Sequence, residues 1–194
     1  MERRIIKESS HGYNGLEVTD ILLTGRKVFI ANEITTDVCN DIIKQLLVLD
    51  SESSDEITVF ITSPGGSISD GMALYDVIRM LRSPVKTICM GMSASMGAIL
   101  LLAADERLIL KNSEIMIHDP SFGSGKYAGK KPHEIQQQLD LLTRTRDILC
   151  NIIAERTGRD IAEVREKTVT DSYFNAEEAI EFGLATRIAE SSDL

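Results

Sequence analysis

Long apolar runs are absent from this sequence of 194 residues. The longest, such as Ala98–Ala104, fall far short of the ~20 residues that a helix needs to cross a bilayer. The N-terminal residues carry charge but no apolar segment of the kind found in a secretory signal. We therefore expect no membrane as a partner and a cytoplasmic location.

Cysteine is scarce, and positive charge is in deficit. Cys39, Cys89 and Cys150 are far apart and lack the spacing of metal ligands, so we expect reduced, buried thiols and no metal. Lys and Arg number 21 against 30 Asp and Glu, which gives a formal net charge of −9. Nucleic-acid phosphates require clustered Lys and Arg, so nucleic acid is not an expected partner. The short basic cluster at 125–131 is rich in glycine and is typical of a solvated loop.

Phosphate-binding glycine motifs are missing as well. No Walker A pattern occurs, so the chain is not expected to hydrolyse ATP itself. Residues 123–128, GSGKYA, imitate a dinucleotide-binding pattern, but no helix is predicted to open there. We expect no cofactor.

Strand-like and helix-like segments alternate along the chain. Short β-branched or apolar runs predict strands at 27–31, 57–61, 85–90, 107–110 and 114–118. Helical spacing of apolar residues, with capping signals, predicts helices at 36–50, 69–82, 95–104, 132–156, 160–167 and 176–182. This alternation, without a low-complexity linker, favours one α/β domain over residues 1–194 with largely parallel strands. The apolar stripe of the longest helix predicts a docking surface as well as a core face.

Two serines lie among small residues where a predicted strand meets a predicted helix. Ser95 has Ser93 at −2 and Gly97 at +2, the small neighbours that a nucleophile elbow needs because bulk there would clash. Ser93, with Gly91 at −2 and a serine at +2, is also possible, but Ser95 is better placed because the predicted helix begins at it. Helix capping by Ser95 is the alternative.

The stretch TSPGGS, Thr62–Ser67, also follows a predicted strand and precedes a predicted helix. Its two glycines allow positive φ and close backbone approach. The N–H of Gly66 is therefore a candidate donor to an oxyanion. An ordinary turn between strand and helix is the alternative.

A serine nucleophile needs a base, and His118 is the best placed of the three histidines. It ends a predicted strand, whereas His11 lies in a polar terminus and His133 in the first turn of a helix. Adjacent strand residues face opposite ways, so Asp119 is not expected to orient the imidazole. Asp171 is the better candidate, because it lies between a β-branched run and two aromatic residues, where we expect burial beside the imidazole. A structural histidine and a turn-forming aspartate are the alternatives.

Four blocks of the sequence are similar, in order, to the ClpP family, the proteolytic subunits of Clp proteases. They are FITSPGGSISDGMALYDVI, ICMGMSASMGAILLLAA, NSEIMIHDPSFG and AEEAIEFGLATRI, and the likeness runs from about residue 28 to 188. The resemblance implies a serine endopeptidase with Ser95 as nucleophile, His118 as general base and Asp171 as orienting carboxylate. It also implies Gly66 and Met96 as backbone donors to the oxyanion.

The same resemblance implies a crotonase-like spiral of ββα units, with a handle region at about 119–156 and an N-terminal axial segment at 1–27. It further implies stacked heptameric rings, forming a tetradecamer that encloses the catalytic sites. Unfolded protein substrates would be fed into that chamber by an AAA+ unfoldase such as ClpX, and the segment after His118 would line the substrate as an added strand.

This sequence departs from the family pattern at several positions. Thr62 replaces a usual asparagine, Thr170 and Ser172 replace arginines that commonly flank Asp171, and the loop after His118 is longer. The segment before residue 28 also lacks the tyrosine-rich stretch that is usual in the family. These departures favour a divergent paralogue and leave open a ring subunit that is inactive without a partner paralogue, in a hetero-oligomer. A crotonase acting on a coenzyme A thioester, which would not need Ser95, is a further alternative.

Overall fold

The computed structural model describes residues 4–9, 12–122, 129 and 131–194. His11, the glycine pattern at 123–128 and most of the predicted basic loop lie outside the described residues. The strands are β1 Arg4–Ser9, β2 Gly12–Glu17, β3 Lys27–Ile30, β4 Ile57–Ser63, β5 Val85–Ala94, β6 Glu106–Ile109, β7 Glu114–Ile117, β8 Ser172–Phe174 and β9 Arg187–Ile188. The helices are α1 Val18–Thr24, α2 Thr36–Glu52, α3 Ile68–Met80, α4 Met96–Leu101, α5 Pro132–Thr157, α6 Ile161–Thr168 and α7 Ala176–Phe182, with a short 3₁₀ helix at Ser191–Asp193.

The central sheet is mostly parallel, as predicted, and β5 is its hub. Its strand order is β3-β4-β5-β6-β9, with all of these neighbours parallel. The first half of β5 pairs with β6, and its last residues, Met92–Ala94, pair with β7 instead. Gly91, with φ of 70°, lies where the pairing changes. The strand β8 then adds antiparallel to β7, so the end of β5 opens a second small set of strands.

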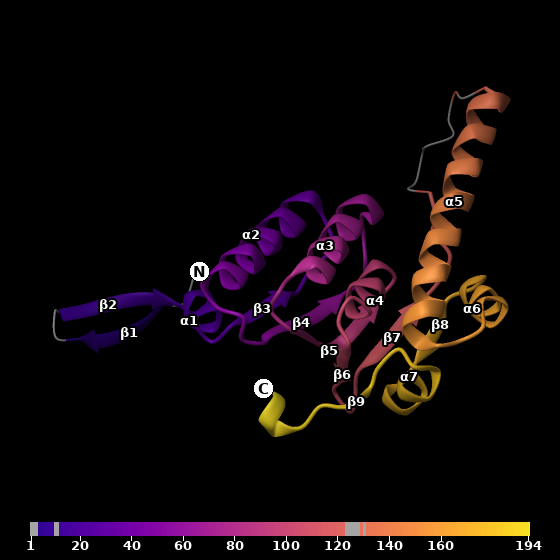
Figure 1. The fold of residues 1–194 in the computed structure, drawn as a ribbon. Coiled ribbons are helices and arrows are strands. Elements are labelled where there is room, and N and C mark those ends of the chain that lie inside the picture. Colours follow the sequence, from indigo (N-terminus) through magenta and orange to yellow (C-terminus); the bar gives the residue numbers. More distant parts are fainter. Residues whose placement is uncertain (1–3, 10–11, 123–128, 130) are drawn as a thin grey trace.

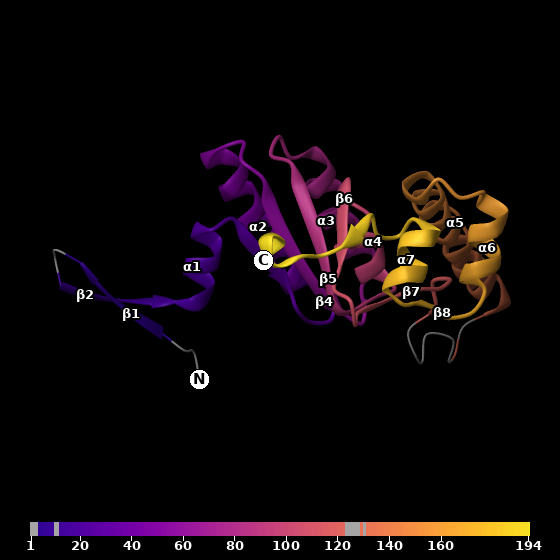
Figure 2. The same cartoon turned by 90° about the horizontal axis from the view of Figure 1, so that it is seen from below.

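The helices α2, α3 and α4 lie side by side along one face of the sheet (Figures 1 and 2). Each connects one parallel strand to the next, and such crossovers wind with a constant right-handed sense. The result is the predicted α/β spiral. The helix α5 projects beyond this body, with α6 and α7 near its C-terminal end, and the β1–β2 hairpin extends away on the opposite side (Figure 1).

Capping signals in the sequence place several helix ends correctly. The hydroxyl of Thr35 accepts a hydrogen bond from Val38 N at the start of α2. Asn175 and Glu178 form the predicted capping box at the start of α7. Gly158 ends α5 in the left-handed conformation with φ of 72°, as expected of a helix that terminates at glycine.

The long helix α5 buries only part of its apolar stripe. Its buried residues are Leu149, Cys150 and Ile153, near its C-terminal end. Leu139 and Leu141, further toward its N-terminus, are 47% and 64% exposed. A docking surface on the exposed part of α5 stays a prediction, and the exposure of these two leucines is consistent with it.

No described helix is both long and apolar enough to cross a membrane.

The three cysteines are free and buried. Burial raises the pKa of all three thiols, to about 11 for Cys89. At pH 8 a thiol with a pKa of about 11 is thiolate in roughly one molecule per thousand, and the thiolate is the nucleophile. We therefore expect the native protein to resist iodoacetamide at pH 8, and the unfolded protein to take up three labels, measured by intact mass. Rapid labelling without denaturant would contradict this burial.

Candidate active site

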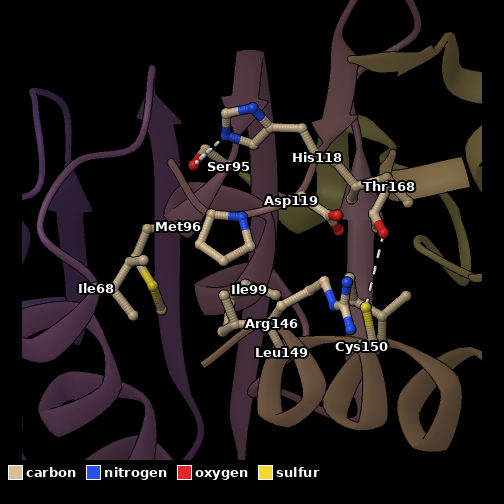
Figure 3. A pocket seen from close by; sticks show the side chains of 13 residues that line it. Ile68, Ser95, Met96, Ile99, His118, Asp119, Arg146, Leu149, Cys150 and Thr168 are labelled. Carbon is tan, nitrogen blue, oxygen red and sulfur yellow. Dashed lines mark hydrogen bonds between the residues drawn. The ribbon is translucent and has the colours of Figure 1, made fainter. Parts of the chain in front are cut away.

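Ser95 lies at the junction between β5 and α4 in a strained backbone conformation, with φ of 54° and ψ of −119°. Positive φ is uncommon outside glycine and marks a constrained turn. The Ser95 N–H is held by a hydrogen bond of 2.8 Å to Met116 O on β7. Its hydroxyl makes no capping bond to α4 and instead lies 2.9 Å from His118 Nε2 (Figure 3). The side chain therefore faces the imidazole, which disfavours the capping alternative.

Ser93 occupies a different environment. It is 0% exposed, and its hydroxyl donates to Ile61 O at 3.4 Å. A hydroxyl enclosed in this way cannot meet a substrate, so Ser93 is a structural residue of β5.

Pairing between β7 and β8 brings Asp171 to His118. The register places Ile117 opposite Ser172, so one further step puts His118 opposite Asp171. His118 Nδ1 and Asp171 Oδ1 are 3.1 Å apart. Because a carboxylate oxygen only accepts, Nδ1 is the donor here and Nε2 is left to accept from the Ser95 hydroxyl. Serine, imidazole and carboxylate thus form one hydrogen-bonded line across the ends of β5, β7 and β8.

The expected burial of Asp171 is wrong. Its side chain is 56% exposed, and that of His118 is 26% exposed. Asp171 immediately precedes β8, a strand of three residues at the edge of the sheet. Tyr173, one of the aromatic residues expected to cover it, is itself exposed, because alternate residues of so short an edge strand point outward.

The glycine turn after β4 packs directly against the serine turn. A Cβ on Gly65 would lie 2.6 Å from Ser95 Cβ and 3.1 Å from Met96 N, so only glycine permits this approach.

Gly66 forms a bridge to Ile34, in which Ile34 N donates to Gly65 O and Ser67 N donates to Ile34 O. In a parallel bridge the bonds flank the central residue, so the Gly66 N–H points away from Ile34. The part played by Gly65 was not predicted, although the Pro-Gly-Gly pattern signals a close backbone approach.

If Gly66 donates to the oxyanion of a peptidase, as the sequence predicts, Gly66→Ala is expected to lower the rate of peptide hydrolysis by about 10²-fold or more, the cost of losing one such donor. Gly66 has φ of 148°, and an added Cβ would lie 2.3 Å from Ile34 O, so the turn must move. Gly158→Ala is the matched control, because that glycine also has positive φ but has open space around it. Initial rates on a quenched peptide compare the two variants, and equal rates would remove Gly66 from the site.

The other candidate residues lie apart from this line. His133 is exposed at the start of α5. Asp119 makes no hydrogen bond to His118 within the described chain, and its backbone N–H donates to Thr168 O at 2.6 Å. Among the described residues, no group of three or more His, Cys, Asp or Glu side chains is arranged to hold a metal ion.

Two comparisons with known proteins point to the same family. The profile of the Clp protease family matches residues 10–192. The ATP-dependent Clp protease proteolytic subunit of Ligilactobacillus salivarius (strain UCC118) is 37% identical over 190 residues, which span 96% of this chain and 94% of that protein. Both matches cover the serine, histidine and aspartate described above.

Proposed function

The chain belongs to the Clp protease family, and on that premise we propose that Ser95, His118 and Asp171 are the catalytic triad of this serine peptidase. The observation that carries the proposal is the pair of contacts at His118, 2.9 Å from its Nε2 to Ser95 Oγ and 3.1 Å from its Nδ1 to Asp171 Oδ1. Nucleophile, base and orienting group have these relations in serine hydrolases of unrelated folds.

The reaction is peptide-bond hydrolysis in two steps. As Ser95 Oγ attacks the carbonyl carbon, His118 Nε2 takes the hydroxyl proton, and Asp171 stabilises the imidazolium that forms. His118 then gives this proton to the leaving amine, and the C–N bond breaks. Water, activated by the same imidazole, hydrolyses the acyl-enzyme and frees the serine.

The negative charge that develops on the carbonyl oxygen needs donors nearby. Gly66 N–H and Met96 N–H are proposed for this role. The first residues of a helix have backbone N–H groups without intrahelical partners, and Met96 is the first residue of α4. The packing of Gly65 against Ser95 and Met96 supports both donors facing the same small volume.

The chain is further proposed to assemble into stacked rings and to receive unfolded proteins from a Clp ATPase, of which ClpX is one candidate. The exposed Leu139, Leu141 and Ile148 of α5 supply an apolar surface for contact between subunits. Whether the rings hold one kind of subunit or also a paralogue is a separate prediction. The alternative of a subunit inactive on its own is not favoured, since the Ser95–His118–Asp171 contacts form within the single chain.

Labelling with a fluorophosphonate probe tests the assignment. Wild-type protein is expected to be labelled once per chain, Ser93→Ala is expected to be labelled as well, and Ser95→Ala is not. Probe and peptide assays should be run with and without a candidate paralogue. Labelling that survives Ser95→Ala would remove the proposed nucleophile, and thioester turnover by that variant would instead favour the crotonase alternative.

A further inference from the structure

The connection between α6 and β8 carries Asp171 and is exposed over its whole length. It consists of Val169, Thr170 and Asp171, and all three are exposed. Within the described chain, the Asp171 carboxylate has one hydrogen-bond partner, His118. An exposed segment with few contacts has many accessible conformations, and conformational entropy opposes any single one of them. The position of this carboxylate therefore depends on what holds the two ends of the connection.

The first end of the connection, at the C-terminus of α6, is anchored in the core. Thr168, the last residue of α6, is 1% exposed, and its hydroxyl lies 3.6 Å from Cys150 Sγ on α5 (Figure 3). Its backbone carbonyl accepts a hydrogen bond of 2.6 Å from the N–H of Asp119, the residue that follows His118. The end of α6 is thus fixed to the end of β7, where the imidazole is attached.

The second end of the connection is closed by Ser172. Its hydroxyl donates to Lys167 O at 2.7 Å, the carbonyl that precedes that of Thr168. The last carbonyls of a helix have no intrahelical partners, so both are available to these donors. Two consecutive carbonyls at one helix end therefore bind the residue after the base and the residue after its orienting carboxylate. The pairing of β8 with β7 extends only to Ser172, opposite Ile117, one residue short of Asp171.

We propose that Ser172 is a positioning residue that keeps the Asp171 carboxylate against His118 Nδ1. Its bond to Lys167 O joins positions five apart and so limits the conformations open to the exposed residues between them. An orienting carboxylate acts by holding the imidazole in the correct tautomer and by stabilising the imidazolium, and both effects need this contact. The inference rests on the proposed function, because it takes Asp171 as a member of the triad.

Three substitutions at position 172 test the proposal in the assembled protein. Ser172→Ala and Ser172→Val remove the hydroxyl and are expected to lower kcat for a quenched peptide about fivefold, with KM unchanged, since one hydrogen bond no longer favours the aligned geometry. Ser172→Thr has the shape of the valine variant but keeps the hydroxyl, and it is expected to retain most of kcat. Equal kcat in Ser172→Val and Ser172→Thr would overturn the proposal.

Ser51→Ala is the matched control for these variants. The Ser51 hydroxyl donates to Val48 O at 2.7 Å in an exposed part of α2, so this change removes a bond of the same kind and length away from the triad. It is expected to leave kcat unchanged. If Ser51→Ala lowers kcat as much as Ser172→Ala does, the loss is not specific to the connection that carries Asp171, and the proposal is wrong.

A double variant shows whether Ser172 acts through Asp171. In the wild-type background, Ser172→Val is expected to lower the rate of fluorophosphonate labelling of Ser95 about fivefold. In an Asp171→Ala background the same change is expected to alter that rate by less than about twofold, because the group that Ser172 positions is already gone. An equal decrease in both backgrounds would give Ser172 a general structural role and overturn the proposal.

A crystal structure of the Ser172→Val protein separates this proposal from the proposed function. The Asp171 carboxylate is expected to leave hydrogen-bond distance of His118 Nδ1, and an unchanged contact would overturn the positioning role. Ser95-dependent hydrolysis with wild-type kcat in Ser172→Val would overturn the positioning role alone. A displaced carboxylate in the variant, together with no Ser95-dependent hydrolysis or labelling in the wild type, would uphold the positioning of Asp171 and overturn the proposed function.

Discussion

Replacing His118 with alanine is expected to lower kcat for peptide hydrolysis by about 10⁶-fold, as is replacing Ser95, and combining the two changes is expected to lower it no further. The reason is that, in the proposed mechanism, the hydroxyl and the imidazole act as one unit. Without the base, Ser95 Oγ keeps its proton, and without the hydroxyl the imidazole has no nucleophile to activate. The 2.9 Å contact between them is the geometric basis for this expectation.

Single-turnover kinetics on a quenched peptide measure these rates down to the residual level set by binding and the oxyanion donors. Ser93→Ala is the control, because it removes a hydroxyl two residues away that faces the core. It is expected to retain most of the activity. If the effects of His118→Ala and Ser95→Ala multiply in the double variant, the two residues act independently and the proposed mechanism is wrong.

The largest expected loss of stability follows Arg107→Met, at about 3 kcal/mol or more of the free energy of unfolding. Arg107 is 8% exposed and donates to five backbone carbonyls, those of Ala104, Asp105, Arg156, Gly183 and Leu184. These carbonyls lie at or just beyond the C-terminal ends of α4, α5 and α7. Helix C-termini leave carbonyls without partners and favour positive charge. One guanidinium therefore satisfies three helix ends. Burial lowers the pKa of Arg107, but from a value so far above neutral that the side chain stays charged.

Urea unfolding followed by circular dichroism, at one fixed protein concentration, measures the effect. Arg107→Lys keeps the charge but cannot reach five carbonyls with one ammonium group, so it is expected to lie between Arg107→Met and the wild type. Arg144→Met, at an exposed position, is expected to change the free energy of unfolding by less than about 0.5 kcal/mol. An Arg107→Met variant as stable as this control would show that water replaces the guanidinium at all three helix ends.

The sequence predicts most helices and several strands of the central sheet, because apolar periodicity and caps are local signals. It misplaces the end of β5, which continues through Gly91 and Ser93 to Ala94 although neither residue favours a strand. The predicted helix at 95–104 is shorter in the structure, Met96–Leu101. At its start, the Ser95 N–H binds β7, so Ser95 is not a helical residue. The strand β8 and the β1–β2 hairpin were not predicted, because their pairing depends on partners rather than on local composition.

The residues of the proposed site could be named from the sequence, but their environment could not. Small neighbours of Ser95 and the strand-end position of His118 are visible in the sequence, and the family resemblance points to Asp171. The exposure of Asp171 depends on which residues of β8 face outward, and no local pattern encodes that. Arg107 was missed as a structural centre, since an arginine that binds carbonyls looks like any other charged residue in a sequence.

The strained backbone at Ser95 also bears on when, during folding, the enzyme becomes able to react. Its unfavourable torsion angles are maintained by Met116 O and by the close approach of Gly65, partners about 20 to 30 positions away along the chain. A nascent or partly unfolded polypeptide lacks both restraints, and the turn then relaxes toward commoner geometry. We therefore expect the proposed nucleophile to reach its reactive geometry only after these distant segments have docked, so a partly folded subunit lacks an aligned Ser95.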